Sequence, residues 1–220
     1  MSLRPELTPL PELMRHLPVD KRGWVIPYFV AWVNGEPEFR AMDPAKWKRC
    51  ARERLCWVCG QKLGSYLAFT LGPMCTITRT TPEPPSHRVC AEWSAINCPF
   101  LSRPHMVRRE DELVNTESAK NNVAGEMIAR NPGAVAVWIT RSYKIWHDGR
   151  NKPLITVGDP EEVRWYAQGR PATREEVEES IRTGLPLLEA TCEGNAQCLK
   201  DLAERHRAML HLLPPAEVPA

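Results

Sequence analysis

The stretch that decides the fold is Cys56-Trp57-Val58-Cys59-Gly60, together with the later segment His87-Arg88-Val89-Cys90. In each segment, two residues separate two side chains that bind soft or borderline metals. A tight turn directs both sulfurs of the first pair to one side of a metal ion, and the start of a helix turns residues i and i+3 toward one point. The spacing therefore predicts a tetrahedral Zn²⁺ site with three thiolates and one imidazole, from Cys56, Cys59, His87 and Cys90.

The other cysteines leave alternatives open at this site. Cys75 and Cys98 lie in the same part of the sequence, and either can replace His87 as the fourth ligand. A group of buried free thiols without a metal is a further alternative. Cys50 is expected to be a small core residue. Cys192 and Cys198 are expected to be packed thiols or a disulfide.

The predicted ligand set also bears on catalysis. Four protein ligands leave no open position on the metal for water, so we expect a structural ion and no catalytic residues. Such an ion contributes on the order of 10 kcal/mol to folding. Some treble-clef frameworks carry nucleases that activate water with a histidine. His87 is the only histidine in the predicted finger and is already a ligand, so a metallonuclease is the second alternative.

The order of elements around the ligands is that of a treble-clef zinc finger, which runs knuckle, hairpin and helix. Residues 63–80 are predicted to form the hairpin, with a break at Gly72-Pro73 and a return strand over residues 75–79. Ser86 is expected to cap the helix that carries His87 and Cys90. The fold class that follows is α+β.

The segment before the knuckle has clear local signals. Asn34-Gly35 is a strong hairpin turn between two runs of strand-forming residues in 24–42, because both positions tolerate positive φ. Asp43-Pro44 is a helix N-cap followed by proline at the first helical position, so we predict a basic helix up to Arg54.

The sequence predicts a protein in two parts, a treble-clef-like zinc module and a small β-hairpin and helix domain. The predicted divisions are a proline-rich arm with little structure (residues 1–22), a zinc-binding module with hairpin and basic helix (residues 23–101), a linker (residues 102–117) and an α+β domain (residues 118–220). In the last part we expect a helix over residues 117–130, followed by two strands over residues 134–143 and 154–157. A short helix over residues 159–166 and two longer helices over residues 173–184 and 196–213 should then complete the chain.

Composition limits the classes of protein. The chain has 220 residues, 43% of them hydrophobic, and no run of about 18 apolar residues that would span a bilayer. The proline-rich first residues lack the apolar run of a secretory signal, and eight cysteines without an export signal favour reduced thiols. We therefore expect a cytoplasmic protein without a membrane partner. No glycine-rich phosphate loop is present.

Charge is unevenly distributed along the chain. Residues 15–110 carry 15 basic and 8 acidic residues, whereas residues 111–220 carry 13 and 17. The basic part is the one with the metal ligands, and tryptophans flank its basic helix, an arrangement that suits backbone neutralisation and base stacking. The candidate nucleic-acid-binding residues are Lys46, Lys48, Arg49, Arg52, Arg54, Arg79 and Arg88. The expected partner is DNA or RNA, and the alternative is a host protein whose activity the chain modulates.

Several strings in the chain give it a resemblance. They are Cys56-x-x-Cys59-Gly60, Gly72-Pro73-Met74-Cys75, Glu83-Pro84-Pro85-Ser86-His87-x-x-Cys90, Cys98-Pro99-Phe100-Leu101, Gly169-Arg170-Pro171-Ala172-Thr173-Arg174-Glu175-Glu176, Ser180-Ile181 and Gly184-Leu185-Pro186. With these strings, most of residues 24–188 resembles a group of uncharacterised, cysteine-rich bacterial and phage proteins. The resemblance implies a phage or prophage origin and brings no activity or catalytic residue with it.

Overall fold

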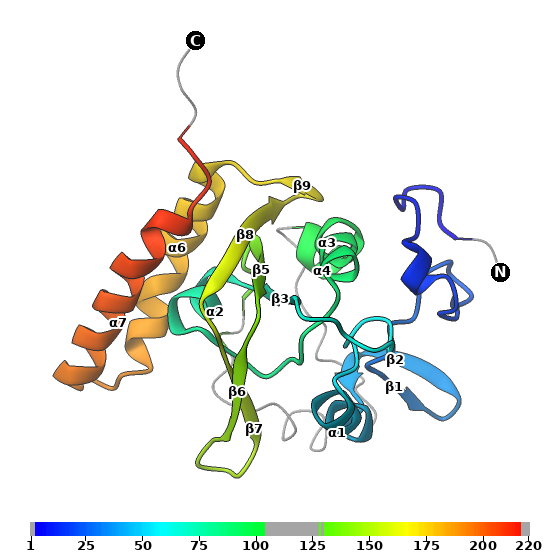
Figure 1. Cartoon of the computed structure of the whole chain (residues 1–220). Helices are drawn as coiled ribbons and strands as arrows, with labels where there is room; N and C mark the ends of the chain where they lie inside the picture. Colours follow the sequence, from blue (N-terminus) through cyan, green and yellow to red (C-terminus); the bar gives the residue numbers. More distant parts are fainter. Residues whose placement is uncertain (1–2, 104–127, 129, 217–220) are drawn as a thin grey trace.

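The computed structural model describes residues 3–103, 128 and 130–216 (Figure 1). It has the α+β fold that the sequence predicts. The strands are β1 (Val30–Val33), β2 (Glu36–Met42), β3 (Leu67–Leu71), β4 (Thr80–Thr81), β5 (Val135–Thr140), β6 (Tyr143–His147), β7 (Pro153–Val157), β8 (Pro160–Ala167) and β9 (Arg170–Pro171). The α-helices are α1 (Pro44–Glu53), α2 (Pro73–Thr78), α3 (Arg88–Asn97), α4 (Pro99–Ser102), α6 (Arg174–Ala190) and α7 (Ala196–Met209), and short 3-10 turns cover Glu12–Met14 and Leu210–Leu212.

The main sheet joins the two halves of the chain. Its strand order is β3-β5-β8-β9, and all its neighbouring strands are antiparallel. A second sheet has the order β4-β7-β6, so it also combines a strand from the first half with two from the second. The predicted division into a zinc module and a separate C-terminal domain is therefore wrong, because pairing distant in sequence builds both sheets.

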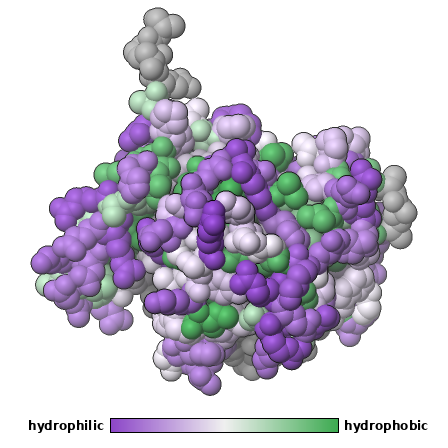
Figure 2. Space-filling model, viewed as in Figure 1, coloured by the Kyte–Doolittle hydropathy of each residue, from purple (hydrophilic) through white to green (hydrophobic). Residues whose placement is uncertain are grey.

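Helices cover both faces of the main sheet. Helix α3 packs on the face formed by alternate residues of β5, where Val135, Val137 and Ile139 meet Ala91 and Ala95. The opposite face packs against α2, α6 and α7 (Figure 1). All six residues of β5 are buried, as expected for a central strand with both faces covered. The outward surfaces of α6 and α7 are mainly hydrophilic (Figure 2).

The local signals upstream of the knuckle are confirmed. Asn34 and Gly35 have φ values of 52° and 82°, and they connect β1 to β2. The Asp43 side chain accepts hydrogen bonds from the Ala45 and Lys46 amides at the start of α1. These elements depend on residues close in sequence, which is why the pattern identifies them.

Some predicted elements are wrong. The return strand over residues 75–79 is instead helix α2, with Gly72 at the N-cap and Pro73 in its first turn, and the Thr76 hydroxyl donates to the Pro73 carbonyl. The expected helix over residues 159–166 is strand β8, and helix α6 continues past Gly184 and through Pro186 to Ala190. The residue that caps α3 is His87, and Ser86 instead exchanges two backbone hydrogen bonds with Ala68 of β3.

Residues 3–22 of the proline-rich segment pack on the rest of the protein. Met14 is fully buried, and it shares a core cluster with Cys56, Cys59 and Cys90. Its only regular element among the described residues is the turn Glu12–Met14. The predicted linker 102–117 and helix 117–130 lie almost entirely outside the described residues.

Candidate metal centre

The first two candidate ligands come from a tight knuckle. Leu55 and Lys62 form an isolated antiparallel bridge that brings the two ends of the turn together. Inside it, the Gly60 amide donates to the Cys56 carbonyl at 2.8 Å, and the Cys59 amide donates to Cys56 Sγ at 3.4 Å. Gly60 has a φ of +74°, a conformation that glycine adopts without steric cost. The knuckle therefore turns both sulfurs inward.

The other two candidate ligands come from the start of α3. The bridge between Ala68 and Ser86 fixes the approach of the chain, so that His87 becomes the N-cap residue and Cys90 lies in the first turn. The His87 amide donates to Cys56 Sγ at 3.3 Å, which ties the helix start to the knuckle. The bridge between Ala68 and Ser86 stands where a treble clef has a hairpin. The structure therefore does not show the predicted treble clef.

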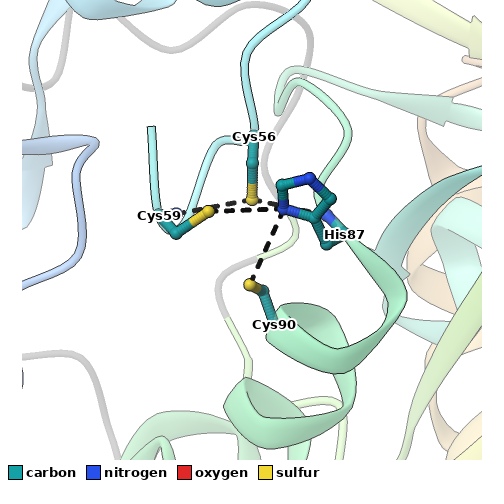
Figure 3. A group of neighbouring side chains, drawn as sticks. All are labelled: Cys56, Cys59, His87 and Cys90. Carbon is teal, nitrogen blue, oxygen red and sulfur yellow. Dashed lines mark hydrogen bonds between the residues drawn. The ribbon is translucent and has the colours of Figure 1, made fainter. Parts of the chain in front are cut away.

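The side chains of Cys56, Cys59, His87 and Cys90 point toward one another, as the sequence predicts (Figure 3). The candidate ligand atoms of Cys56, Cys59, His87 and Cys90 all lie within 4.8 Å of one another. His87 Nδ1 lies 3.3 Å from Cys59 Sγ and 3.9 Å from Cys90 Sγ. A tetrahedron with metal–sulfur bonds of about 2.3 Å has edges of about 3.8 Å, so this spacing fits one shared ion. The three sulfurs are buried.

Contacts around the ligands orient them further. His87 Nε2 lies 3.0 Å from the Lys62 carbonyl oxygen, which only accepts, so Nε2 carries a proton and Nδ1 is left to face the sulfurs. His16 Nε2 donates in the same way to the Cys59 carbonyl at 2.9 Å, and Gln61 contacts His16 Nδ1. Sequence reasoning missed His16 because it lies in the proline-rich segment, far from the knuckle in sequence, and no spacing rule marks it.

Without a metal, the cluster shares protons unevenly. Burial opposes ionisation of Cys56, but hydrogen bonds with Cys59, Cys90 and His87 outweigh it and hold the pKa of Cys56 well below its usual range. Hydrogen bonds to Cys56 and Cys59 raise the pKa of His87 to about 10 and the pKa of Cys90 above its usual range. The cluster thus favours a thiolate beside a cation, the charge pattern that a divalent ion replaces.

No protein-family model, curated protein or solved structure matches this chain. Within the residues that the structure describes, no helix is both long and apolar enough to cross a membrane. Residues 3–103, 128 and 130–216 contain one group of three or more potential metal ligands, the Cys₃His cluster.

The alternative ligands lie elsewhere. Cys75 and Cys98 are outside the cluster, and burial raises the pKa of Cys75 to about 11 and that of Cys98 above its usual range. Cys50 is buried in the core as predicted, with a pKa raised by burial to about 12. A fourth thiolate in place of His87 is therefore not what the structure shows.

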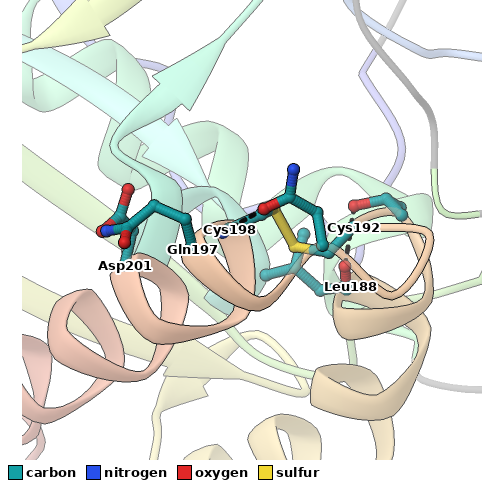
Figure 4. Close-up of a disulfide and its surroundings, with 7 residues drawn as sticks. Leu188, Cys192, Gln197, Cys198 and Asp201 are labelled. Atoms are coloured by element: carbon teal, nitrogen blue, oxygen red, sulfur yellow. Dashed lines mark hydrogen bonds between the residues drawn. A yellow bond between two sulfur atoms is a disulfide. The ribbon is translucent and has the colours of Figure 1, made fainter.

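The two cysteines near the C-terminus form a disulfide (Figure 4). Cys192 and Cys198 join the end of α6 to the first turn of α7, with their Cα atoms 5.6 Å apart. A disulfide was one of the predicted alternatives for this pair.

The structure divides the candidate nucleic-acid-binding residues into two groups. Lys48, Arg49, Arg52 and Arg54 are exposed on or directly after α1. The others are used in internal contacts: Lys46 Nζ donates to the Val30 carbonyl, Arg79 pairs with Asp159 over the Trp138 ring, and Arg88 pairs with Glu92 and Glu162.

The tryptophans beside the basic helix are structural. Trp57 is buried and stacks on Phe29 with ring centroids 5.2 Å apart. Trp47 packs against the core, and its Nε1 donates to the Pro82 carbonyl at 2.8 Å. Neither indole is presented for stacking, so any aromatic contact with a ligand has to come from another part of the surface.

Proposed function

We propose that this chain is a phage or prophage protein that uses a structural Zn²⁺ to hold a basic helix in place and binds nucleic acid without catalysis. The observation that carries the proposal is the exposed basic face of α1, the helix that ends just before the knuckle. The expected setting is the cytoplasm of a bacterial host.

The choice of zinc rests on the donor set. Three thiolates and one imidazole in a buried, closed group are typical of structural zinc sites, whereas magnesium and calcium select oxygen ligands. Elemental analysis and native mass spectrometry of untagged protein should find one zinc per chain. Cys59→Ser should lose the metal, and the matched variants Cys75→Ser and Cys98→Ser should keep it. Retention of zinc by Cys59→Ser would contradict the assignment.

The basic face has more positive charge than its neighbours neutralise. Glu53 is the acidic residue of α1, and both Arg49 and Arg52 pair with it, at 3.2 and 2.5 Å. Lys48 has no side-chain partner among the described residues, and Arg54 donates to the Gly64 carbonyl at 3.3 Å. One carboxylate among four exposed cations leaves a positive surface that suits phosphate groups.

A charge-matched pair of variants tests this face. Lys48→Gln with Arg52→Gln removes two cations four residues apart on α1, and Lys200→Gln with Arg207→Gln removes two from the exposed side of α7. If α1 contacts phosphates, the first pair weakens binding to labelled DNA or RNA and lowers the slope of log K against log salt by about one per side chain, and the second pair changes neither.

The alternatives predict other results. A protein partner held by apolar contact gives binding that hardly depends on salt, and an absence of affinity for DNA and RNA at low salt would overturn the proposal. A metallonuclease needs a histidine free to activate water. His87 directs Nδ1 to the sulfurs and Nε2 to a carbonyl, so neither nitrogen is free for that role.

A further inference from the structure

The β6–β7 hairpin is a basic, aromatic element in the second half of the chain. The β6–β7 hairpin with its flanks, residues 141–152, has four basic residues and one acidic residue, although residues 111–220 are acidic as a whole. Strand β6 is at the edge of its sheet, and four of its five residues are exposed. The hairpin and α1 lie toward the same end of the molecule (Figure 1).

The hairpin presents an indole to solvent. Trp146 is 42% exposed, and its Nε1 donates to Thr156 Oγ1 at 3.0 Å, which fixes the ring against the strand. Lys144 is two residues away, so it projects from the same face of the hairpin. Neither Lys144 nor Lys152 has a side-chain partner among the described residues.

Contacts on the surface connect the hairpin to α1. Arg54, at the end of α1, donates to the Gly64 carbonyl, and two residues later the Tyr66 hydroxyl accepts from Arg141, just before β6. Burial raises the pKa of Tyr143 in β6, and the nearby Arg54 guanidinium opposes that rise. The basic end of α1 and the base of the hairpin are therefore neighbours.

A second aromatic side chain lies on this connecting strip. Tyr66 is 52% exposed even though the Arg141 guanidinium lies over its ring, 4.6 Å from the centroid. The surface from α1 to the hairpin tip thus carries unpaired cations and two exposed aromatic rings. Rings of this kind stack on bases that are unstacked, and a duplex keeps its bases stacked on one another.

We infer that the surface from α1 through Tyr66 to the β6–β7 hairpin binds single-stranded nucleic acid, with Lys144 and Lys152 on the phosphates and Trp146 stacked on a base. The inference rests on the proposed function and deepens it, because it names the class of nucleic acid and adds a stacking residue. Double-stranded nucleic acid is the competing ligand, and the test separates the two.

The test is fluorescence anisotropy at fixed salt with labelled single-stranded DNA, single-stranded RNA and duplex DNA of equal length. The full-length, zinc-loaded protein should bind a single strand at least about tenfold more tightly than the duplex. Trp146→Ala should weaken single-strand binding roughly 5- to 150-fold, the range for loss of one stacked base. Trp146→Phe should restore most of the affinity, because it keeps an aromatic face.

The matched control is Trp32→Ala. Trp32 is a similarly exposed indole, at 50%, on β1 of another hairpin, and its removal should change affinity less than about twofold. Equal affinity for duplex and single strand, or an unchanged affinity in Trp146→Ala, would overturn the inference. If the α1 variants still weaken binding in that case, the proposed function stands without it; absence of all binding at low salt overturns both.

Discussion

Gly60 is the residue of the knuckle with the least room for a side chain. Its φ is +74°, and a Cβ built on it would lie 2.7 Å from Cδ2 of Tyr28. Gly35 has a similar φ of +82° but nothing within 4 Å, so it is a control for backbone strain alone. We expect Gly35→Ala to lower the free energy of unfolding by about 1 kcal/mol and Gly60→Ala by roughly 2–4 kcal/mol in urea titrations.

The Gly60→Ala substitution should also affect metal binding. Because the same turn directs both knuckle sulfurs, displacement of the Tyr28 ring or of the turn should weaken zinc retention in competition with a chelator. Gly35→Ala should retain zinc as the unmodified chain does. Equal losses of stability in the two variants would show that the contact with Tyr28 is unimportant.

Thiol reactivity distinguishes ligands from core cysteines. Burial raises the pKa of Cys50 to about 12 and of Cys75 to about 11, so these thiols stay protonated and should resist iodoacetamide at pH 8. With zinc bound, the ligand sulfurs should also be protected. A pulse of the reagent given with chelator, shorter than the unfolding that follows loss of the ion, should label Cys56 before Cys50 and Cys75, as read by peptide mass spectrometry, because the metal-free cluster lowers the pKa of Cys56. Early labelling of Cys75 in place of a ligand cysteine would contradict the ligand set.

At the scale of elements, the capping box of α6 is a clear test. The Thr173 hydroxyl accepts from the Glu176 amide, and the Glu176 carboxylate accepts from the Thr173 amide at 2.9 Å. Thr173→Ala should lower the free energy of unfolding by about 1 kcal/mol in chemical denaturation. Thr191→Ala removes an exposed hydroxyl at the other end of α6 and should change it by less than about 0.5 kcal/mol. Equal effects would argue against the cap.

The elements that the sequence predicted correctly are those with strong local signals. Asn34-Gly35 marks a turn and Asp43-Pro44 marks a helix start, each within a few residues, and the structure confirms both. Asp159-Pro160 is typical of a helix start, which is why the local pattern predicts a helix where the structure has strand β8. Apolar and charged residues nevertheless alternate along β8, as is typical of a strand. Val163, Trp165 and Ala167 face one core, whereas Glu162 and Arg164 face α3.

Tertiary contacts decided the elements that were missed. Pairing with β5 over six residues stabilises β8 as a strand, which outweighs a helix propensity of a few tenths of a kcal/mol per residue. Pro186 stays inside α6 for the same reason, because the helix packs on α2 and the sheet. The candidate metal ligands were predictable because each pair is local, whereas His16 and the Lys62 carbonyl reach the site only through the fold.

At the scale of the whole molecule, the candidate metal centre belongs to a core that both halves share. The cluster that contains Cys56, Cys59 and Cys90 also contains Trp138 of β5 and Ile155 of β7. Strand β3, between the knuckle and α3, pairs along its whole length with β5. Loss of the ion should therefore lower the stability of the second half of the chain as well, although none of the candidate ligands lies there.

Magnitudes make this a sharp prediction. A structural zinc contributes on the order of 10 kcal/mol, and a domain of this kind has a total stability of about 5–15 kcal/mol. Removal of the ion should therefore leave the chain unfolded or close to it, in one cooperative transition. In hydrogen exchange with a chelator, β5 amides such as that of Val137 should lose protection together with those of α3. If β5 kept its protection while α3 lost its own, the zinc-binding part and the remaining fold would be independent, contrary to the shared sheet.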